Sequence, residues 1–534
     1  MTGKSVEQVL FINDFKGLAY HNGDESKLED GEFVSFTNCL PLSNGSFMPR
    51  PGLFSSTGVS AHGQSDGYCV PLSIVGVAGT FYYHLLINNK VFFSNNGENS
   101  FTEVTYLAAS IANPTQAFVI VDDSVYFKAG AGLLTWTLGL STATLVTASF
   151  VGGVPEPEHL MYYEKRMYAW NATDNILQYS DINDFTTWNQ LTFDFDGAYD
   201  NIMAVKVYRD NLYIFTPNQI WLLSVEGEPA DWEAVAVVTT VGCVSPFCLL
   251  EDDGLIYFLS KKGVYVFDGL NIDNLTSKIH PLTLSPYSWS DTINISDPLS
   301  PYMAKWRDYL FFRVYQVGSD IGFGGDIGVA PFWFILNLKT GSIAPILFAT
   351  PANTVFDVVN CSGRAIPWEF NLTGYSSKGI AIPGYTATNT IKVPYVSFLA
   401  SEVPSPIVLD RSDTVSTYLE YVADDMGETF EVWFKTKKFD FGAPGFLKKV
   451  QSVQFEVTTF SSYTATLNYR HIVDGVVGST QTATLDGNRG IVSLKPPGVC
   501  TTWQLECWFN PASTKAIIFN SLKVHYRVKS QVYS

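Results

Sequence analysis

Four stretches of the sequence repeat one pattern: DDSVYF (residues 122–127), YEKRMYAW (163–170), YRDNLYIF (208–215) and EDDGLIYF (251–258). Each holds a polar turn followed by an aromatic strand, and a further short apolar strand comes next. The tyrosines that align the copies are 42, 45 and 44 residues apart: Tyr126, Tyr168, Tyr213 and Tyr257. A recurrence of roughly 40–50 residues with several strands per unit is typical of propeller blades.

The repeat extends beyond these four copies in both directions. Tyr82 lies 44 residues before Tyr126, and residues 307–312 form a sixth copy. A degenerate seventh unit is expected at residues 354–372. The sequence therefore predicts a β-propeller of about six blades over residues 61–385. It is preceded by an N-terminal arm (1–60) and followed by a connector (386–430).

The last part of the chain has a different pattern. Residues 431–534 alternate polar and apolar positions in short runs that turns separate, which predicts a β-sandwich. The whole chain is 46% hydrophobic, 15% aromatic and only 16% charged, which excludes a disordered protein. No long stretch has helical periodicity, so the predicted fold class is all-β.

The net charge of −18 excludes a general nucleic-acid-binding surface, because affinity for phosphate needs clustered Lys and Arg. An acidic surface serves solubility, or lines a passage through which polyanions slide without sticking. The seven cysteines include no CxxC pair, so neither a zinc site nor a disulfide framework is expected, and buried reduced thiols are the preferred interpretation. The polar N-terminus predicts no signal peptide, and no apolar run predicts a membrane span.

Short motifs at both ends and in the middle of the chain resemble one family. The N-terminal pieces are DFKGL (residues 14–18), LEDGE (28–32) and NGSFMPRPG (44–52). The central pieces are RDNL (209–212), VGCVSP (241–246) and YFLS (257–260), and TKKFDFGAPG (436–445) opens the C-terminal part. Together they are similar to the tail nozzle, or tail-tubular, proteins of short-tailed bacteriophages.

This resemblance implies a structural virion protein with a β-propeller. It implies a homo-oligomeric ring, expected to be a hexamer, that contacts the phage adaptor and the tail fibre or needle proteins. The ring would help to retain the genomic DNA and conduct it during ejection without sequence-specific binding. The implied location is the tail of the virion, assembled in the host cytoplasm, with no membrane insertion.

No pattern of catalytic residues was found, so we expect no enzyme, no catalytic residues, no cofactor and no metal site. The seven histidines are isolated, and residues 322–328 lack the last glycine of a dinucleotide fingerprint. A sialidase-like site would need three convergent arginines. The blade arginines mostly begin repeated strands, which favours a structural role such as pairing with Asp210 or Asp308 in the turn. Those arginines are Arg166, Arg209, Arg307, Arg313 and Arg364.

Two further alternatives stay open at this point. One alternative is calcium binding by the acidic pairs Asp122 with Asp123 and Asp252 with Asp253. Aspartates at such positions more commonly accept backbone hydrogen bonds in a turn. The aromatic residues Trp188, Trp221 and Trp232 are expected to pack between blades rather than to hold sugars. A receptor- or glycan-binding propeller would use the loops expected at residues 318–328 and 374–384.

Overall fold

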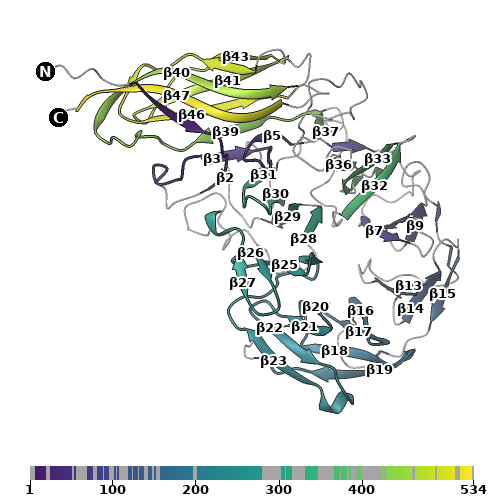
Figure 1. Ribbon diagram of the computed structural model, residues 1–534. Coiled ribbons are helices and arrows are strands. Elements are labelled where there is room, and N and C mark those ends of the chain that lie inside the picture. Colours follow the sequence, from purple (N-terminus) through teal and green to yellow (C-terminus); the bar gives the residue numbers. More distant parts are fainter. Residues whose placement is uncertain are drawn as a thin grey trace.

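The computed structural model is built almost entirely of β-strands (Figure 1). It describes residues 7–19, 24–50, 53–55, 69–75, 81–87, 90–94, 102–103, 105–106, 118–122, 124–129, 132–137, 142–146, 150–151, 157–195, 201–279, 302–306, 308–315, 331–346, 366–372, 375–381, 384–385, 391–392, 394–397, 424–425, 428–459, 464–486, 490–511 and 517–531. Within these residues the helical segments are two short 3-10 turns, Pro229–Asp231 and Ser277–Ile279. The predicted all-β class is confirmed.

The middle of the chain is a β-propeller, as the repeat predicts. Four of its sheets are four-stranded antiparallel meanders whose strands follow chain order. The first of these sheets comprises β7 (Cys69–Val75), β8 (Phe81–Ile87), β9 (Lys90–Ser94) and β10 (Thr102–Glu103). The second comprises β16 (His159–Tyr163), β17 (Arg166–Trp170), β18 (Ile176–Asp181) and β19 (Asp184–Thr192). The third comprises β20 (Ala204–Tyr208), β21 (Asn211–Phe215), β22 (Ile220–Ser224) and β23 (Glu233–Val238). The fourth comprises β24 (Leu249–Asp252), β25 (Leu255–Ser260), β26 (Gly263–Phe267) and β27 (Ile272–Asn274).

Three more sheets lie in this part of the chain (Figure 1). One comprises β12 (Phe118–Val121), β13 (Ser124–Ala129), β14 (Gly132–Thr137) and β15 (Thr142–Val146), with β11 (Thr105–Tyr106) parallel to β15. A second begins with β28 (Tyr302–Trp306), β29 (Tyr309–Tyr315), β30 (Pro331–Asn337) and β31 (Ile343–Ile346). A third is ordered β32 (Ile366–Leu372), β33 (Tyr375–Ala381), β36 (Pro394–Ser397), β6 (Leu53–Ser55), β37 (Asp424–Asp425) and β38 (Glu428–Thr429).

Two-residue turns explain why the repeat begins with polar residues. In three sheets the first and second strands are joined by two residues that both have positive φ: Glu164 and Lys165, Arg209 and Asp210, and Asp253 and Gly254. Such turns match the twist of a hairpin and favour Asn, Asp and Gly. The quoted repeat is therefore the hairpin of the first two strands, and its tyrosine lies in the second strand. The fourth, outermost strand carries no part of the motif.

The strands of the C-terminal unit belong to two sheets. Its principal strands match the alternating runs of the sequence: β39 (Val432–Thr436), β40 (Phe446–Thr459), β41 (Thr464–Val473), β43 (Gln481–Asp486), β44 (Ile491–Leu494), β46 (Trp503–Phe509) and β47 (Ile517–Gln531). Phe434 from one sheet contacts Phe455 and Phe519 from the other, with ring centroids 5.9 and 5.6 Å apart. The unit also has three short strands, β42 (Val476–Val477), β45 (Val499–Cys500) and the N-terminal β1 (Glu7–Ile12).

The N-terminal segment joins the propeller to this unit and does not project as an arm. β1 pairs with β47, and β5 (Phe47–Pro49), which pairs with β4 (Cys39–Pro41), also contacts β47. β2 (Gly17–Leu18) pairs with β31 of the propeller on one side and with β3 (Glu32–Thr37) on the other. β3 in turn pairs with β39. One eleven-stranded sheet thus runs from the propeller through the N-terminal segment into the C-terminal unit.

Candidate functional site

The junction between the propeller and the C-terminal unit brings together the three N-terminal motifs. We define the junction as the described residues of 12–50 with the parts of β31, β39 and β46 that they contact. The backbone N–H of Phe15, in the first motif, donates to the carbonyl of Gly45, in the third, at 2.6 Å. The next N–H, of Lys16, donates to Gly31 of the second motif at 2.8 Å. Three pieces that are separate in sequence therefore form one structure.

Aromatic rings fill the centre of the junction. Phe47 lies at the hub, with ring centroids 5.0 Å from Phe15, 5.1 Å from Phe434 and 4.8 Å from Phe519. Phe33 joins the same group from β3, 5.9 Å from Phe47. Edge-on and stacked rings at these separations add to the stabilisation that burial alone supplies. Because the rings come from both ends of the chain, the C-terminal unit depends on the N-terminal segment for its core.

Two glycines of the motifs are required by close backbone contacts. Gly31 has φ of 91°, and a Cβ at this position would lie 2.0 Å from the carbonyl oxygen of Asp14. Gly17 has φ of 79°, and its Cβ would lie 2.7 Å from backbone atoms of Ile343 in β31. Only glycine combines a positive φ with such an approach at no steric cost.

Arg50 and Asn38 form a buried polar pair at the centre of the junction. The Arg50 side chain is only 1% exposed, and its Nε donates to Asn38 Oδ1 at 3.0 Å. Its guanidinium lies 3.9 Å above the ring of Phe430. Asn38 has φ of 56°, donates from its backbone to Pro345 of the propeller, and donates from its side chain to the Glu431 carbonyl at 2.7 Å. The pair thus connects the N-terminal segment, the propeller and the C-terminal unit.

Ion pairs surround this centre. Acidic residues of the N-terminal segment meet lysines from both neighbours: Glu25 with Lys435 at 3.2 Å, Asp30 with Lys437 at 2.7 Å, and Glu32 with Lys278 of the propeller at 3.3 Å. Gln504 of β46 also donates to Glu25 at 2.9 Å. Partly exposed pairs of this kind contribute little singly, and their value here is in fixing the orientation of the two units.

Neighbouring propeller sheets are tied together by a repeated contact that the sequence motif did not reveal. Tyr163, the last residue of β16, donates from its hydroxyl to the carbonyl of Asp210 in the next sheet's hairpin turn at 2.8 Å. Tyr208, at the same position of β20, donates to Gly254 in the following turn at 2.5 Å. Both turns thus accept a hydrogen bond from the preceding sheet. One signal was present in the sequence, since a tyrosine directly precedes the turns at residues 164–165 and 209–210.

The tryptophans pack between sheets, as predicted. Trp232 lies against Tyr179 of the preceding sheet at 5.0 Å, with the Arg166 guanidinium 5.8 Å from its ring. Trp221 contacts Phe195, which follows the preceding sheet, at 5.3 Å. Trp188 is buried beside Phe150.

The arginines that were considered for catalysis act in the scaffold, but not through the predicted aspartates. Arg166 donates to the Ser180 carbonyl at 2.8 Å, and Arg209 donates to the Gly254 carbonyl at 3.3 Å while stacking on Tyr208. The suggested pairing with Asp210 or Asp308 is therefore wrong for these two. Arg307 and Arg364 lie outside the described residues, and so does the Arg313 side chain.

Asp122 and Asp253 of the acidic pairs sit at hairpin turns with φ of 53° and 52°, and Asp123 lies outside the described residues. Asp252 and Asp253 both contact Lys305 of the next sheet, a cation in the place where calcium was considered. The loop proposed at residues 374–384 is wrong, because Tyr375–Ala381 forms strand β33. The loop at residues 318–328 lies outside the described residues.

The shifted pKa values of thiols and phenols in the described residues follow mainly from burial, whereas the lowered pKa of the Asp268 carboxyl follows mainly from backbone hydrogen bonds. Burial raises the pKa of Cys243 to about 12 and that of Cys500 to about 11, and it raises the pKa of Tyr168 strongly. No group of three or more His, Cys, Asp or Glu side chains in the described ranges is placed to hold a metal ion. In the same ranges no helix is long and apolar enough to cross a membrane.

Comparisons with known proteins give likeness in fold only. No protein-family model matches the chain, and no curated protein matches it. Among solved structures, the chain is similar to the Neurospora crassa Pan2 WD40 domain, with 10% identity, a TM-score of 0.34, and 64% of this chain and 90% of that one covered. It is also similar to YCF48 bound to D1 peptide, with 9% identity, a TM-score of 0.37, and 67% and 100% covered. A third similar structure is the AfRom2 CNH domain, with 10% identity, a TM-score of 0.33, and 63% and 98% covered.

Proposed function

We propose that this chain is a structural protein of a bacteriophage tail, a nozzle that assembles as a homo-oligomeric ring below the adaptor. In this role the ring conducts the DNA genome during ejection and helps to retain it before. A hexamer is the proposed state. The partners are other copies of the chain, the adaptor, and the fibre or needle proteins. The chain carries no enzymatic activity in this proposal.

One observation supports a mechanical role most directly. The junction is not a flexible linker but a continuous hydrogen-bonded sheet with a shared aromatic core. Domains that move relative to each other meet through small, polar interfaces, whereas a large apolar interface couples them rigidly. A rigid body of this kind suits a ring that must keep its shape while DNA passes.

The architecture in this proposal has two finer features. We infer a ring of seven units, because strand β32 contacts both β28 and β7 and so closes the circle where a seventh unit was considered. In this ring β6, from the N-terminal segment, completes the last sheet by pairing with β36. Linking the two ends of a propeller in one sheet leaves only short, protected edges. The C-terminal unit is then a β-sandwich closed by N-terminal strands.

The mass of the particle in solution tests this proposal. Native mass spectrometry of the 59.1 kDa chain should give a closed ring, with six copies expected. Electron microscopy of the same particle should show an axial channel. A chain that stays monomeric at all concentrations and salt conditions would contradict the ring and favour a monomeric binding module.

The lumen provides a second test, on the electrostatic part of the proposal. We expect a channel surface poor in Lys and Arg, because cations that neutralise phosphates hold DNA in place. A reconstruction of the ring with a lumen lined mainly by lysine and arginine would rule out the non-adhesive passage, while leaving the ring itself intact.

A further inference from the structure

The formal charge is distributed very unevenly along the chain. Residues 431–534 carry 12 Lys and Arg but only 6 Asp and Glu, a net charge of +6. Residues 1–430 carry 21 Lys and Arg against 45 Asp and Glu, a net charge of −24. The total of −18 therefore hides two parts of opposite sign.

Three basic residues of the C-terminal unit, Lys449, Lys523 and Arg527, share one outer sheet face. Cross-strand neighbours define it, since paired residues point to the same side of a sheet. Arg527 is flanked by Glu7 of β1 and by Lys449 of β40, and Lys449 in turn by Val499. Lys523 lies between Phe11 and Gln454 in a parallel row of the same face. Among the described residues of this face only Glu7 and Glu456 carry negative charge, and each already pairs with a cation of the face.

Lys449 of this face and Lys529, two residues beyond Arg527 on β47, have no acidic partner among the described residues. Lys449 and Lys529 are exposed, and neither forms an ion pair within the ranges that the structure covers. Lys449 is moreover the cross-strand neighbour of Arg527, an arrangement of like charges that is unfavourable in isolation.

The same face exposes large apolar side chains. Val9 and Phe11 on β1 are 51% and 49% exposed, and Ile491 and Val499 are similarly exposed on the far strands. β1 pairs only with β47 among the described strands, so its other edge is open. Edges of this kind are usually covered or charged in monomeric proteins. Mixed basic and apolar character indicates a contact surface for a protein.

The propeller carries a matching surface at its far end. The turn between β22 and β23 and its flanks hold four exposed acidic residues, and Asp181 lies at the tip of the neighbouring sheet: Glu226, Glu228, Asp231, Glu233 and Asp181. No ion pair of the described residues involves any of them. Exposed apolar side chains lie among them, Ile182 and Val235. We call this surface the acidic end and the sheet face described above the basic face.

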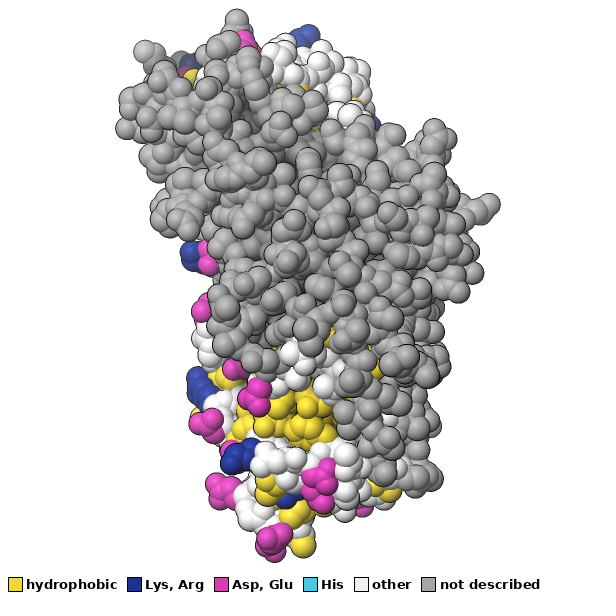
Figure 2. Space-filling view, turned by 90° about the vertical axis from the view of Figure 1, so that its right-hand side faces the viewer, with side chains coloured by type: hydrophobic (Ala, Val, Ile, Leu, Met, Phe, Trp, Pro, Cys, Tyr) yellow, Lys and Arg dark blue, Asp and Glu magenta, His cyan; other side chains and the backbone are white. Residues whose placement is uncertain are grey.

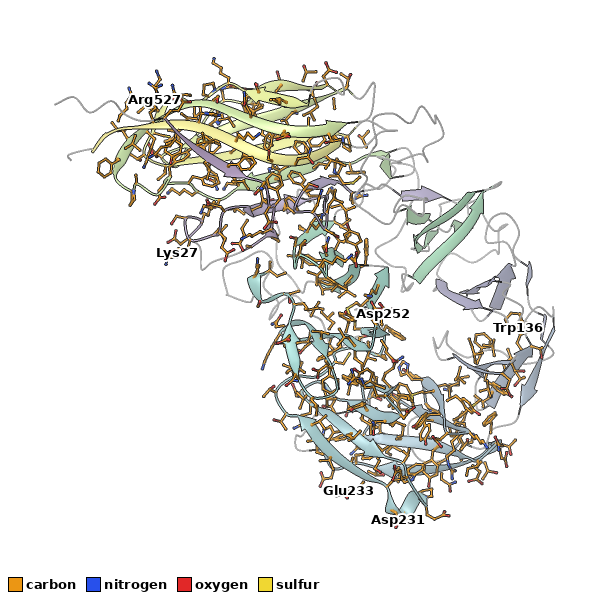
Figure 3. All side chains as sticks on the ribbon, in the orientation of Figure 1. Lys27, Trp136, Asp231, Glu233, Asp252 and Arg527 are labelled. Carbon is orange, nitrogen blue, oxygen red and sulfur yellow. The ribbon has the colours of Figure 1, made fainter. Side chains whose placement is uncertain are left out.

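The two surfaces lie at opposite ends of the molecule. Figure 3 labels Arg527 on the C-terminal unit at the top and Asp231 and Glu233 at the bottom. Figure 2 likewise shows Asp and Glu side chains gathered at the lower end, beside a hydrophobic area. One chain cannot bring both surfaces together, whereas two copies placed head to tail can.

We propose that the basic face of one copy binds the acidic end of the next, so that the chain associates head to tail with itself. This inference rests on the proposed ring, because it names the surfaces that hold the ring together. A contact between two different surfaces closes into a ring when the rotation between copies permits it. Opposite charges steer the copies together, and the exposed apolar side chains become buried.

A second copy fits the basic face better than nucleic acid does. A phosphate backbone is bound by dense Lys and Arg, without carboxylates among them. Here Glu7 and Glu456 stand among the cations, and four exposed apolar side chains share the face. The acidic end, with its carboxylates and the exposed Ile182 and Val235, complements the cations and apolar side chains of the basic face.

Charge reversal of each surface tests the proposal. Lys449→Glu with Lys529→Glu reverses the basic face, and Asp231→Lys with Glu233→Lys reverses the acidic end. Each variant alone should raise the dissociation constant of the assembly about tenfold or more, measured by sedimentation velocity at low salt. Mixing the two variants, each with one intact surface, should restore assembly. Wild-type assembly should weaken as the salt is raised to 1 M.

The matched control is Lys261→Glu with Lys262→Glu, at the turn between β25 and β26, which changes the net charge as much as the basic-face variant does. The control should assemble like the wild type. Equal weakening by the control, undiminished assembly of both reversed variants, or failure of the mixture to assemble would overturn the inference. A gel-shift assay tests whether the basic face binds DNA instead. If the variant Lys449→Glu, Lys529→Glu lost DNA binding but assembled like the wild type, the face would be assigned to nucleic acid and the inference would be overturned. If the wild type forms a ring and the reversed variants form it equally well, only this interface is refuted. If the wild type is a monomer, the proposed ring itself is refuted.

Discussion

Two kinds of joint hold this molecule together, and they differ in chemistry. The described propeller sheets are largely separate hydrogen-bonded units that meet through rings and hydroxyls, such as Trp232 on Tyr179 and Tyr208 on the Gly254 carbonyl. The junction instead continues a backbone ladder from β31 to β39 and buries Arg50 within it. The propeller uses one modest contact again from sheet to sheet, whereas the junction concentrates different contacts at one place.

This difference decides how each joint responds to change. A repeated side-chain contact can be lost at one sheet while its equivalents remain. The junction has no equivalent elsewhere among the described residues, and its polar groups are buried. Removing one partner of a buried polar pair leaves the other unsatisfied, which costs more than the bond contributed. Four changes test the contrast, from the largest expected effect to the smallest.

Replacing Arg50 should have the largest effect. Arg50→Ala removes a large buried side chain that packs on Phe430 and leaves Asn38 Oδ1 without this donor, so we expect a loss of about 3–5 kcal/mol in the free energy of unfolding. Urea unfolding followed by fluorescence measures it. Lys27→Ala, at an exposed lysine of the same segment, should cost less than about 1 kcal/mol. Similar effects of the two changes would contradict a special role for the junction.

Gly31→Ala should come next, with a loss of about 2–4 kcal/mol. The positive φ alone costs roughly 1–2 kcal/mol for a residue with a Cβ, and the new methyl would also collide with the Asp14 carbonyl. Gly475→Ala separates the two causes, because Gly475 has φ of 83° but nothing lies within 4 Å of its Cβ position. Thermal unfolding of both variants measures the difference. Equal losses would show that the close approach at Gly31 is relieved easily.

His471, in the C-terminal unit, should make stability depend on pH. It is 4% exposed, its Nδ1 accepts from Trp503 at 3.0 Å, and its Nε2 contacts the Lys495 carbonyl at 2.7 Å. Burial lowers the pKa of His471 below the ordinary 6.5. The unfolded chain therefore binds a proton first as the pH falls, so stability is complete above about pH 6.5 and declines below it, by at most about 1.4 kcal/mol per pH unit.

The matched variant for this effect is His471→Gln. It should be less stable than the wild type at pH 7, but its further loss between pH 7 and 5 should be smaller, as measured by urea unfolding at both values. Parallel pH profiles for the two proteins would show that His471 titrates in the folded protein as it does when unfolded.

Tyr208→Phe should have the smallest effect, a loss of about 0.5–1.5 kcal/mol, the usual net value of one hydrogen bond. Tyr163→Phe should behave alike, because its hydroxyl makes the equivalent contact one sheet earlier. Tyr162→Phe is the control, since the Tyr162 hydroxyl makes no hydrogen bond among the described residues. Thermal unfolding compares the three. A loss as large as that of Arg50→Ala would erase the distinction between the two joints.

The sequence predicted the repeated part of the fold well. The spacing of Tyr126, Tyr168, Tyr213 and Tyr257 identified the propeller, and the residues before these tyrosines located the hairpin turns. The repeat did not predict the fourth strand of each sheet, because the sequences of these outermost strands differ from sheet to sheet. Val235 of β23 and Trp188 of β19, for example, occupy different environments, one exposed and one buried.

The junction was visible only in fragments. DFKGL, LEDGE and NGSFMPRPG stood out as motifs, but nothing in their spacing said that Lys16 would bond to Gly31 or that Asn38 would reach Glu431. The partners lie up to 393 residues apart, and contacts at such separations leave no periodic signal. The loop expected at residues 374–384 failed for a related reason, since its strand β33 is stabilised by distant partners including, through β36, the N-terminal β6.

By itself the sequence determined the fold class, the propeller and the alternating strands of the C-terminal unit, because local periodicity and turn chemistry act over neighbouring residues. Only the tertiary structure decided that the N-terminal segment lies inside the junction, that Arg50 is buried, and that the basic face and the acidic end lie at opposite ends. These depend on strand pairing between the two ends of the chain, which is set by the complementarity of surfaces that form only once the chain has folded.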